Sequence, residues 1–400
     1  MENLLKRYPM MVVAVLFAVG IAAGRVASPT LPLLFWCLSA VASLVCAAAF
    51  HRRAWLQSLM LMLTVFCIGG GRMSMDKGNA SARQSEKPSN QLREAIVERM
   101  NSLFAEDGAV DEGSVVVAMS MGEKRLIERD LRADYATSGA AHVLALSGLH
   151  IGIVFFFFKL LVPRRRPSSL SRWHLFGESL LIAAIWCYVL LVGMPPSAVR
   201  AATMVSLYEV MSLQCRDRVS LNVIGTTAFM MLMFCPTDIY NIGFEFSFAA
   251  VISIILNFKT FYSIVSEPSN RIVKALWSMV CVSMAAQIGV APLIAYHFGY
   301  VAVYSVFSSM VVVPCAWVIV NLSVLLILFL KFAAVARLIV VPLALTADFM
   351  NDCVTWFAAL PGATIDNVEL NGAQLLTLYL AIGSTCLLAY RYVKHKTVKD

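Results

Sequence analysis

Apolar segments of about 20 residues recur along this chain, and they constrain its fold more than any other feature. A helix of this length spans the hydrocarbon core of a bilayer and satisfies its own backbone hydrogen bonds. The composition agrees, because 60% of the residues are hydrophobic and only 14% are charged. The sequence therefore predicts an all-α polytopic membrane protein with about 11–12 transmembrane or membrane-embedded helices and one small external polar segment.

The predicted membrane helices form one group before the polar segment and another after it. The earlier spans are residues 9–24, 30–50 and 54–71. The later spans are residues 140–162, 175–193, 197–213, 220–236, 243–260, 274–297, 301–330, 335–350 and 373–391. Pro314 interrupts the long run at 301–330, which predicts a kinked or re-entrant segment. Acidic and aromatic residues mix in 345–360, which predicts an amphipathic helix at the outer interface.

Three short elements are expected in the polar segment, residues 73–137. Apolar residues recur at helical spacing within 90–104, which predicts a helix. The β-branched run at 114–119 predicts a short strand, and the charged stretch 124–135 predicts a helix that leads into the next span. We expect these elements to lie outside the membrane.

Charge is distributed unevenly along the chain. Residues 73–139 contain nine Lys and Arg against twelve Asp and Glu, a charge of −3, while the whole chain carries +8. The positive excess lies in alternate short loops, such as 164–166, 216–218 and 391–399. This pattern follows the positive-inside rule and predicts cytoplasmic N- and C-termini. The basic composition thus indicates membrane topology rather than a nucleic-acid-binding patch.

The sequence predicts a division into four parts. They are an N-terminal three-helix membrane segment (1–72), the external polar segment (73–137), a membrane core (138–392) and a cytoplasmic basic tail (393–400). The ten cysteines are scattered, mostly within apolar runs, and we expect small buried side chains with no disulfide framework and no zinc site. No cofactor or metal is predicted.

The start of the membrane core carries an unusual set of polar and small residues. His142, Ser147 and His150 lie where a lipid-facing helix would be apolar. On a helix running through this segment, small residues would form one stripe that permits close helix packing, composed of Ala141, Ala145, Gly148 and Gly152. Two interpretations stay open: these side chains pack against neighbouring helices, or they line a polar conduit. No His-Glu-x-x-His spacing occurs and no carboxylate lies within a turn of either histidine, so we predict that the protein is not an enzyme.

A second motif surrounds Arg200. Pro195 and Pro196 separate two spans, and Ser197 is expected to cap the following helix. Arg200 would then lie in the first turn, near the outer face, where a cation opposes both the helix dipole and the positive-inside trend. It is therefore a candidate phosphate contact, and the alternative is an arginine that snorkels or pairs with Glu245.

Further polar residues lie within apolar segments. Glu245 and Gln287 are candidates for the lining of a pore or for helix packing, and Glu209 is another candidate for a cavity-facing side chain.

Several of these motifs together resemble the ComEC family of competence proteins. The resemblance is carried, in order, by His142-Val-Leu-Ala-Leu-Ser-Gly-Leu-His-Ile-Gly152, Pro196-Ser-Ala-Val-Arg-Ala201, Gly243-Phe-Glu-Phe-Ser-Phe248, Gln287 to Pro292 with Phe298-Gly299, and Leu360-Pro-Gly-Ala363. It covers about residues 90–365. Residues 138–392 would then correspond to the family's transmembrane competence region.

The resemblance implies a channel in the bacterial inner membrane that imports single-stranded DNA during natural transformation. Family members often carry an external OB-like domain and a C-terminal metallo-β-lactamase-like domain. We expect neither here, because the 73–90 linker is short and few residues follow the last span.

Several partners follow from this interpretation. They are single-stranded DNA, membrane lipid, a cytoplasmic motor ATPase and an external DNA-binding protein; a homo-oligomer is compatible with it. The motor is expected because no G-x-x-x-x-G-K-[ST] motif occurs, and the external protein because the polar segment is negative. An alternative function is a proton-linked or other solute transporter built on the same membrane core.

Overall fold

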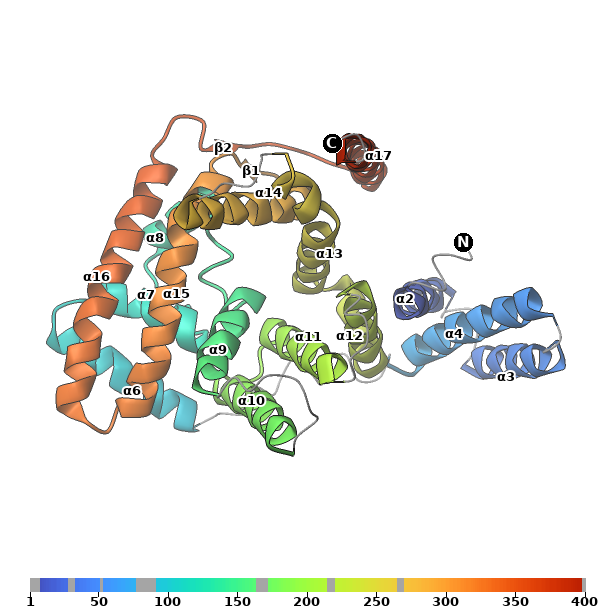
Figure 1. Cartoon of the computed structure of the whole chain (residues 1–400), viewed down its shortest axis with the longest axis horizontal. Coiled ribbons are helices and arrows are strands. Elements are labelled where there is room, and N and C mark those ends of the chain that lie inside the picture. The colour runs from blue at the N-terminus through green and yellow to red at the C-terminus, as the bar shows by residue number, and fades with distance from the viewer. Residues whose placement is uncertain are drawn as a thin grey trace. The chain divides into compact units, whose positions relative to one another are not determined.

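The structure, a computed structural model, is helical in almost every part that it describes (Figure 1). It describes residues 8–27, 33–50, 53–76, 91–162, 172–213, 220–264 and 270–397. Six helices in these ranges are long and apolar enough to cross a membrane, and further apolar helices are shorter. The chain is therefore an all-α polytopic membrane protein. The basic loops predicted at 164–166 and 216–218 lie outside the described residues.

The chain divides into two compact units. The first unit contains Met1–Pro88 and Thr203–Glu245, and the second contains Ser89–Ala202 and Phe246–Asp400, so the boundaries fall within two helices, α11 and α13. The elements up to the boundary in α11 are α2 (Pro9–Ala27), α3 (Leu33–Ala49), α4 (Ala54–Asp76), α6 (Gln91–Glu106), α7 (Val110–Met121), α8 (Arg129–Thr137), α9 (Gly148–Leu161), α10 (Arg172–Leu191) and α11 (Pro196–Leu213). The remaining elements are α12 (Ser220–Phe234), η1 (Pro236–Tyr240), α13 (Ile242–Tyr262), α14 (Arg271–Phe298), β1 (Val301–Ala302), α15 (Ser305–Phe329), α16 (Ala333–Ala358), β2 (Thr364–Ile365) and α17 (Gly372–Thr397).

Glycines hold the first unit together. Helix α2 packs closely against α4, and a Cβ atom at Gly24 would lie only 2.6 Å from the Gly70 carbonyl oxygen. A Cβ atom at Gly20, one turn earlier, would collide with the Phe66 carbonyl oxygen. Gly20 and Gly24 are four residues apart, the spacing that allows the backbones of two membrane helices to approach. Helix α12 covers another part of α2, with the Phe17 ring against the Phe229 ring.

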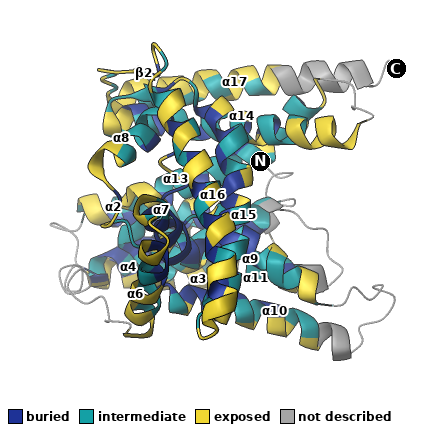
Figure 2. Ribbon diagram, turned by 90° about the vertical axis from the view of Figure 1, so that its left-hand side faces the viewer, coloured by how far each residue is buried: buried dark blue, intermediate teal, exposed yellow. Residues whose placement is uncertain are grey.

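The second unit is built around α7, which is dark blue in Figure 2 because nearly all of its residues are buried. Helices α6, α15 and α16 pack against it, and α8 packs against α16. The prediction of a strand at 114–119 is wrong, since these residues lie inside α7. The helix ends at Gly122, which adopts the left-handed conformation with a φ of 72°. Apolar contact with several helices outweighs the weak strand preference of the three valines.

Two other predicted elements differ from the observed ones. Helix α15 continues through Pro314 as one helix, preceded by the short strand β1, which pairs with β2 in antiparallel fashion. The residues of the predicted interfacial helix, 345–360, belong largely to α16, which is one continuous helix. One of their polar groups contacts another helix, because the Tyr135 hydroxyl of α8 donates a hydrogen bond to Asn351 Oδ1 at 2.8 Å.

Candidate functional site

A polar turn, residues 138–147, precedes α9 in the second unit. The prediction of a helix from residue 140 is wrong here, because α9 begins at Gly148. Gly139 has a φ of 81°, and a Cβ atom there would lie 2.9 Å from the Ser305 Cα of α15, so the backbone turns sharply beside another helix. Ala141 and Ala145 lie in this turn, and the predicted four-residue helical stripe therefore does not form.

Ser147 and His150 together cap the start of α9. The Ser147 backbone N–H donates to His150 Nδ1 at 3.2 Å, and the Ser147 hydroxyl lies 2.9 Å from the same nitrogen. Because Nδ1 accepts these hydrogen bonds, the proton of the neutral ring lies on Nε2. His150 is fully buried, and its Nε2 has no hydrogen-bond partner within the described parts of the chain. Water or a polar ligand usually satisfies such a group in a buried site.

His142 has a different role from His150. Its side chain is exposed, and its Nδ1 lies 3.1 Å from the Gly139 carbonyl oxygen, to which it donates. This contact is local to the turn, so His142 helps to hold the backbone conformation that precedes α9. The sequence grouped the two histidines on one helical face, whereas the structure places only His150 in the helix.

The first turn of α11 lies directly against this cap. Ser197 lies within α11 rather than capping it, and its hydroxyl donates to the Leu146 carbonyl oxygen at 2.5 Å. A Cβ atom at Gly148 would lie 3.7 Å from the Ala201 Cβ atom, so the N-termini of α9 and α11 are adjacent. Each helix N-terminus carries a partial positive charge. Arg200, in the same first turn of α11, is buried with 3% of its surface exposed and adds a full positive charge.

At Gly152, one turn after Gly148, the surface of α9 is open. Of the described residues, none has an atom within 4 Å of the position that a Cβ atom of Gly152 would occupy. The interpretation of Gly148 and Gly152 as a close helix-packing motif therefore fails at Gly152, in contrast to the tight α2–α4 contact in the first unit. A glycine that faces open space near the N-terminus of a membrane helix is compatible with a lining surface.

The remaining predicted residues lie in other helices. Glu245 and Gln287 are both half-buried, in α13 and α14, and their predicted roles stay predictions. Glu209 is buried in α11. Within the described ranges, no three His, Cys, Asp or Glu side chains come together in a group that could hold a metal ion.

A polar contact between α13 and α14 was not predicted from the sequence. The Ser253 hydroxyl donates to the Ala285 carbonyl oxygen at 2.5 Å, and Asn257 Nδ2 donates to Ser253 Oγ at 3.2 Å. The Tyr379 hydroxyl of α17 donates to the Gly289 carbonyl oxygen at 2.7 Å. Polar residues four apart in the apolar α13 are the signal that could have indicated this contact.

Comparisons with known proteins agree on one family. The model of the competence protein family matches residues 119–392. ComE operon protein 3 of Bacillus subtilis (strain 168) is 30% identical over 228 residues, which is 56% of this chain and 26% of that protein. An uncharacterized protein of Aquifex aeolicus (strain VF5) is 32% identical over 272 residues, 68% of this chain and 60% of that protein. Protein YcaI of Escherichia coli (strain K12), also uncharacterized, is 26% identical over 151 residues, or 37% of this chain and 20% of that protein.

The aligned region spans about a quarter of ComE operon protein 3 and about three fifths of the Aquifex protein. No solved structure gives a significant match to this chain. The family match includes the polar turn, α9 and the first turn of α11, and it extends over more than half of the sequence. The chain therefore belongs to the competence protein family.

Proposed function

We propose that this protein forms a passage for single-stranded DNA across the bacterial inner membrane during natural transformation. Membership of the competence protein family, and the similarity to ComE operon protein 3, support a role in DNA uptake. The specific role as a channel rests on the site in the second unit. Its termini and basic loops would then face the cytoplasm, in accordance with the charge distribution of the sequence.

The open space at Gly152 of α9 is the observation that carries this proposal. A polyanion cannot cross hydrocarbon unless polar and positive groups replace its hydration. The site offers the adjacent N-termini of α9 and α11, the Arg200 guanidinium and the Nε2 proton of His150. One turn beyond Gly148, Gly152 leaves room that any larger side chain would fill. These groups are suited to contact with phosphate oxygens, with Arg200 as the strongest single contact.

Two partners would complete the process. A cytoplasmic motor ATPase would draw the strand inward, since the sequence contains no Walker A motif. An external DNA-binding protein would deliver DNA, because the polar segment with its charge of −3 repels phosphates. The channel itself would bind no cofactor, and its hydrophobic surface would contact membrane lipid.

Substitution of Gly152 by leucine tests the passage. We expect Gly152→Leu to reduce transformation frequency by at least about tenfold, because the side chain would enter the open space without a backbone clash. Gly383→Leu in α17 is the matched control, since a Cβ atom at Gly383 also meets nothing within 4 Å. Both variants should reach the membrane in wild-type amounts. Equal transformation by the two variants would contradict the role of the open space at Gly152.

Deletion of the gene tests the function as a whole. In a transformable strain, deletion should abolish transformation while donor DNA still accumulates outside the inner membrane. Complementation with Arg200→Gln should restore less transformation than complementation with the wild-type gene, since a neutral amide offers weaker contacts to phosphate. If the deletion strain transforms normally, DNA import is not the function of this protein, and transport of another solute becomes the proposal to test.

A further inference from the structure

The charged helices α6 and α8 lie against a helix that is long and apolar enough to cross the membrane. Arg337, near the start of α16, forms an ion pair with Glu106 at the end of α6, at 2.8 Å. Near the other end of α16, the Thr355 hydroxyl donates to Asp134 Oδ2 of α8 at 2.8 Å. Residues 337 and 355 are separated by about 27 Å along a helix, close to the ~30 Å thickness of the hydrocarbon core.

Between these two contacts, the buried helix α7 fills the space beside α15 and α16. One apolar core includes Phe104 of α6, Val116 of α7, Ile319 of α15 and Val340 of α16. The part of the polar segment that forms α6–α8 is therefore packed into the side of the α15–α16 pair along nearly the whole length of α16. It is not a separate domain attached beyond the ends of these helices.

The outer surfaces of α6 and α16 differ in character. Exposed side chains of α6 include Glu94, Glu98 and Arg99. Exposed side chains in the first half of α16 are mainly apolar, with Leu338 and Leu345, seven residues apart on one face, at 75% and 65% exposure. In the second half, the exposed Trp356 lies near the exposed carboxylates of Asp348 and Asp352. The apolar face in the first half of α16 suits lipid, whereas carboxylates and guanidinium groups facing lipid would cost several kcal/mol.

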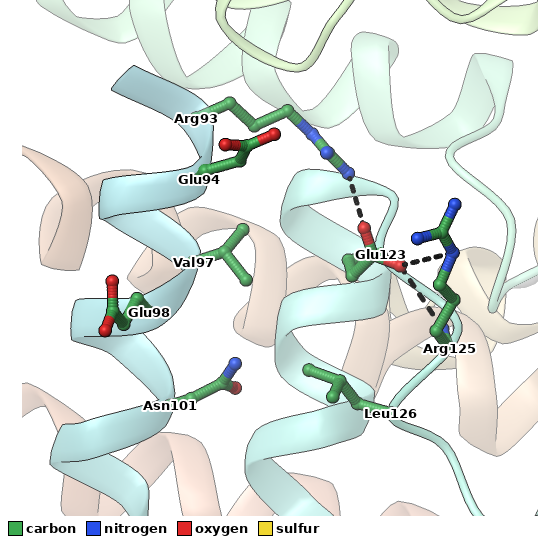
Figure 3. A pocket seen from close by; sticks show the side chains of 8 residues that line it. All are labelled: Arg93, Glu94, Val97, Glu98, Asn101, Glu123, Arg125 and Leu126. Carbon is green, nitrogen blue, oxygen red and sulfur yellow. Dashed lines mark hydrogen bonds and ion pairs between the residues drawn. The ribbon is translucent and has the colours of Figure 1, made fainter. Parts of the chain in front are cut away.

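A hollow with both charged and apolar lining residues lies on the surface of α6 (Figure 3). It has a volume of about 360 Å³, and Glu94 and Glu98 line it on the α6 side. Across the hollow, Glu123 pairs with Arg93 at 3.3 Å and with Arg125 at 3.8 Å. The exposed charged groups around it, Glu94, Glu98 and Arg125, favour contact with water over contact with acyl chains.

We propose that α6–α8 form the wall of a water-filled space at the depth of the hydrocarbon core, with lipid on the opposite face of the first half of α16, around Leu338 and Leu345. The polar segment then belongs to the membrane-embedded part of the protein, in place of the external position expected from its charge. This position of α6–α8 relative to the membrane does not depend on whether DNA is the solute that passes.

Spin labels on the full-length protein in lipid vesicles test this arrangement. In a background with all ten cysteines replaced, single cysteines would carry a nitroxide at paired positions on the two faces. One pair is Ala105 and Leu338, beside the Glu106–Arg337 contact, and the other is Ala133 and Trp356, beside the Asp134–Thr355 contact. Leu345 marks the middle of α16. Collision with a water-soluble nickel chelate and with oxygen then distinguishes water from lipid.

We expect labels at Ala105 and Ala133 to be relaxed by the nickel chelate, and labels at Leu338, Leu345 and Trp356 to be relaxed more by oxygen, with Leu345 deepest. A label at Leu345 that is accessible to the chelate would overturn the proposal, since α16 would then lie outside the hydrocarbon. A label at Ala105 or Ala133 that is accessible only to oxygen would also overturn it, since α6 or α8 would face lipid. Helical content and elution volume of each labelled protein must match those of the unlabelled one.

Discussion

At the scale of single residues, the start of α9 depends on a serine and a histidine that bind each other. Ser147 supplies a backbone N–H and a hydroxyl to His150 Nδ1, and this pair ends the polar turn and begins the helix. Histidine replaces the glutamate or glutamine usual at this position of a capping box. The sequence identified both residues as important but could not identify them as partners, because a helix was expected to run through them.

Removal of the Ser147 hydroxyl should weaken the cap. We expect Ser147→Ala to lower the free energy of unfolding by about 0.5–2 kcal/mol, the usual cost of losing an N-cap hydroxyl. Thermal unfolding of the purified protein in detergent measures this change. Ser384→Ala is the control, because the Ser384 hydroxyl bonds only within the exposed surface of α17. Equal unfolding temperatures of the two variants would mean that the cap does not stabilise α9.

At the scale of elements, burial decides the conformation of α7 and the position of α8. The run of three valines at 115–117 favours a strand by local preference, but α6, α15 and α16 surround it and bury it as a helix. The hydroxyl of Tyr135 then joins α8 to Asn351 of α16. Burial raises the pKa of Tyr135, so the phenol stays protonated and continues to donate at neutral and moderately alkaline pH.

Replacement of Tyr135 by phenylalanine should destabilise the contact between α8 and α16. We expect Tyr135→Phe to lower the free energy of unfolding by about 0.5–1.5 kcal/mol at pH 7, because Asn351 loses its donor. The raised pKa disfavours the ionised phenol in the folded state, so the stability of the wild type should fall as the pH rises above about 10. The variant lacks this group, and the difference between the two proteins should shrink there.

Unfolding by denaturant at pH 7 and near pH 10.5 measures both effects. Tyr304→Phe is the control, since the Tyr304 hydroxyl makes an exposed hydrogen bond to the Pro361 carbonyl oxygen. If the difference in the free energy of unfolding between wild type and Tyr135→Phe stays constant across this pH range, the pKa of the Tyr135 phenol is not raised by folding.

At the scale of the whole molecule, each of the two units is stabilised internally by a different kind of contact. The first unit relies on glycines at a close helix crossing, where Gly20 and Gly24 of α2 meet the backbone of α4. The second unit relies on a buried helix, α7, and on interhelical hydrogen bonds. The same G-x-x-x-G spacing therefore occurs in two different environments in this chain. In α2 both glycines pack closely against another helix, whereas in α9 Gly152 faces open space.

Substitution of Gly24 should disrupt the first unit. A Cβ atom at Gly24 would lie 2.6 Å from the Gly70 carbonyl oxygen, so Gly24→Val forces α2 and α4 apart at a cost of about 1–3 kcal/mol or more. Reduced yield of folded protein and a lower unfolding temperature are the expected results. Gly372→Val is the control, because a Cβ atom there meets no described atom within 4 Å. Wild-type stability of Gly24→Val would contradict the close α2–α4 contact.

The sequence by itself determined the class of fold, most of the membrane helices and the family, because hydropathy, helix length and motif order are local properties of the chain. Tertiary structure alone decided where α9 begins, that α7 is a helix and that Gly152 faces open space. Each of these depends on groups distant in sequence: Ser305 beside Gly139, Ser197 on the Leu146 carbonyl, and α15 and α16 around α7. Local preferences of about 1 kcal/mol or less per residue are smaller than the free energy of such contacts, so the contacts prevail.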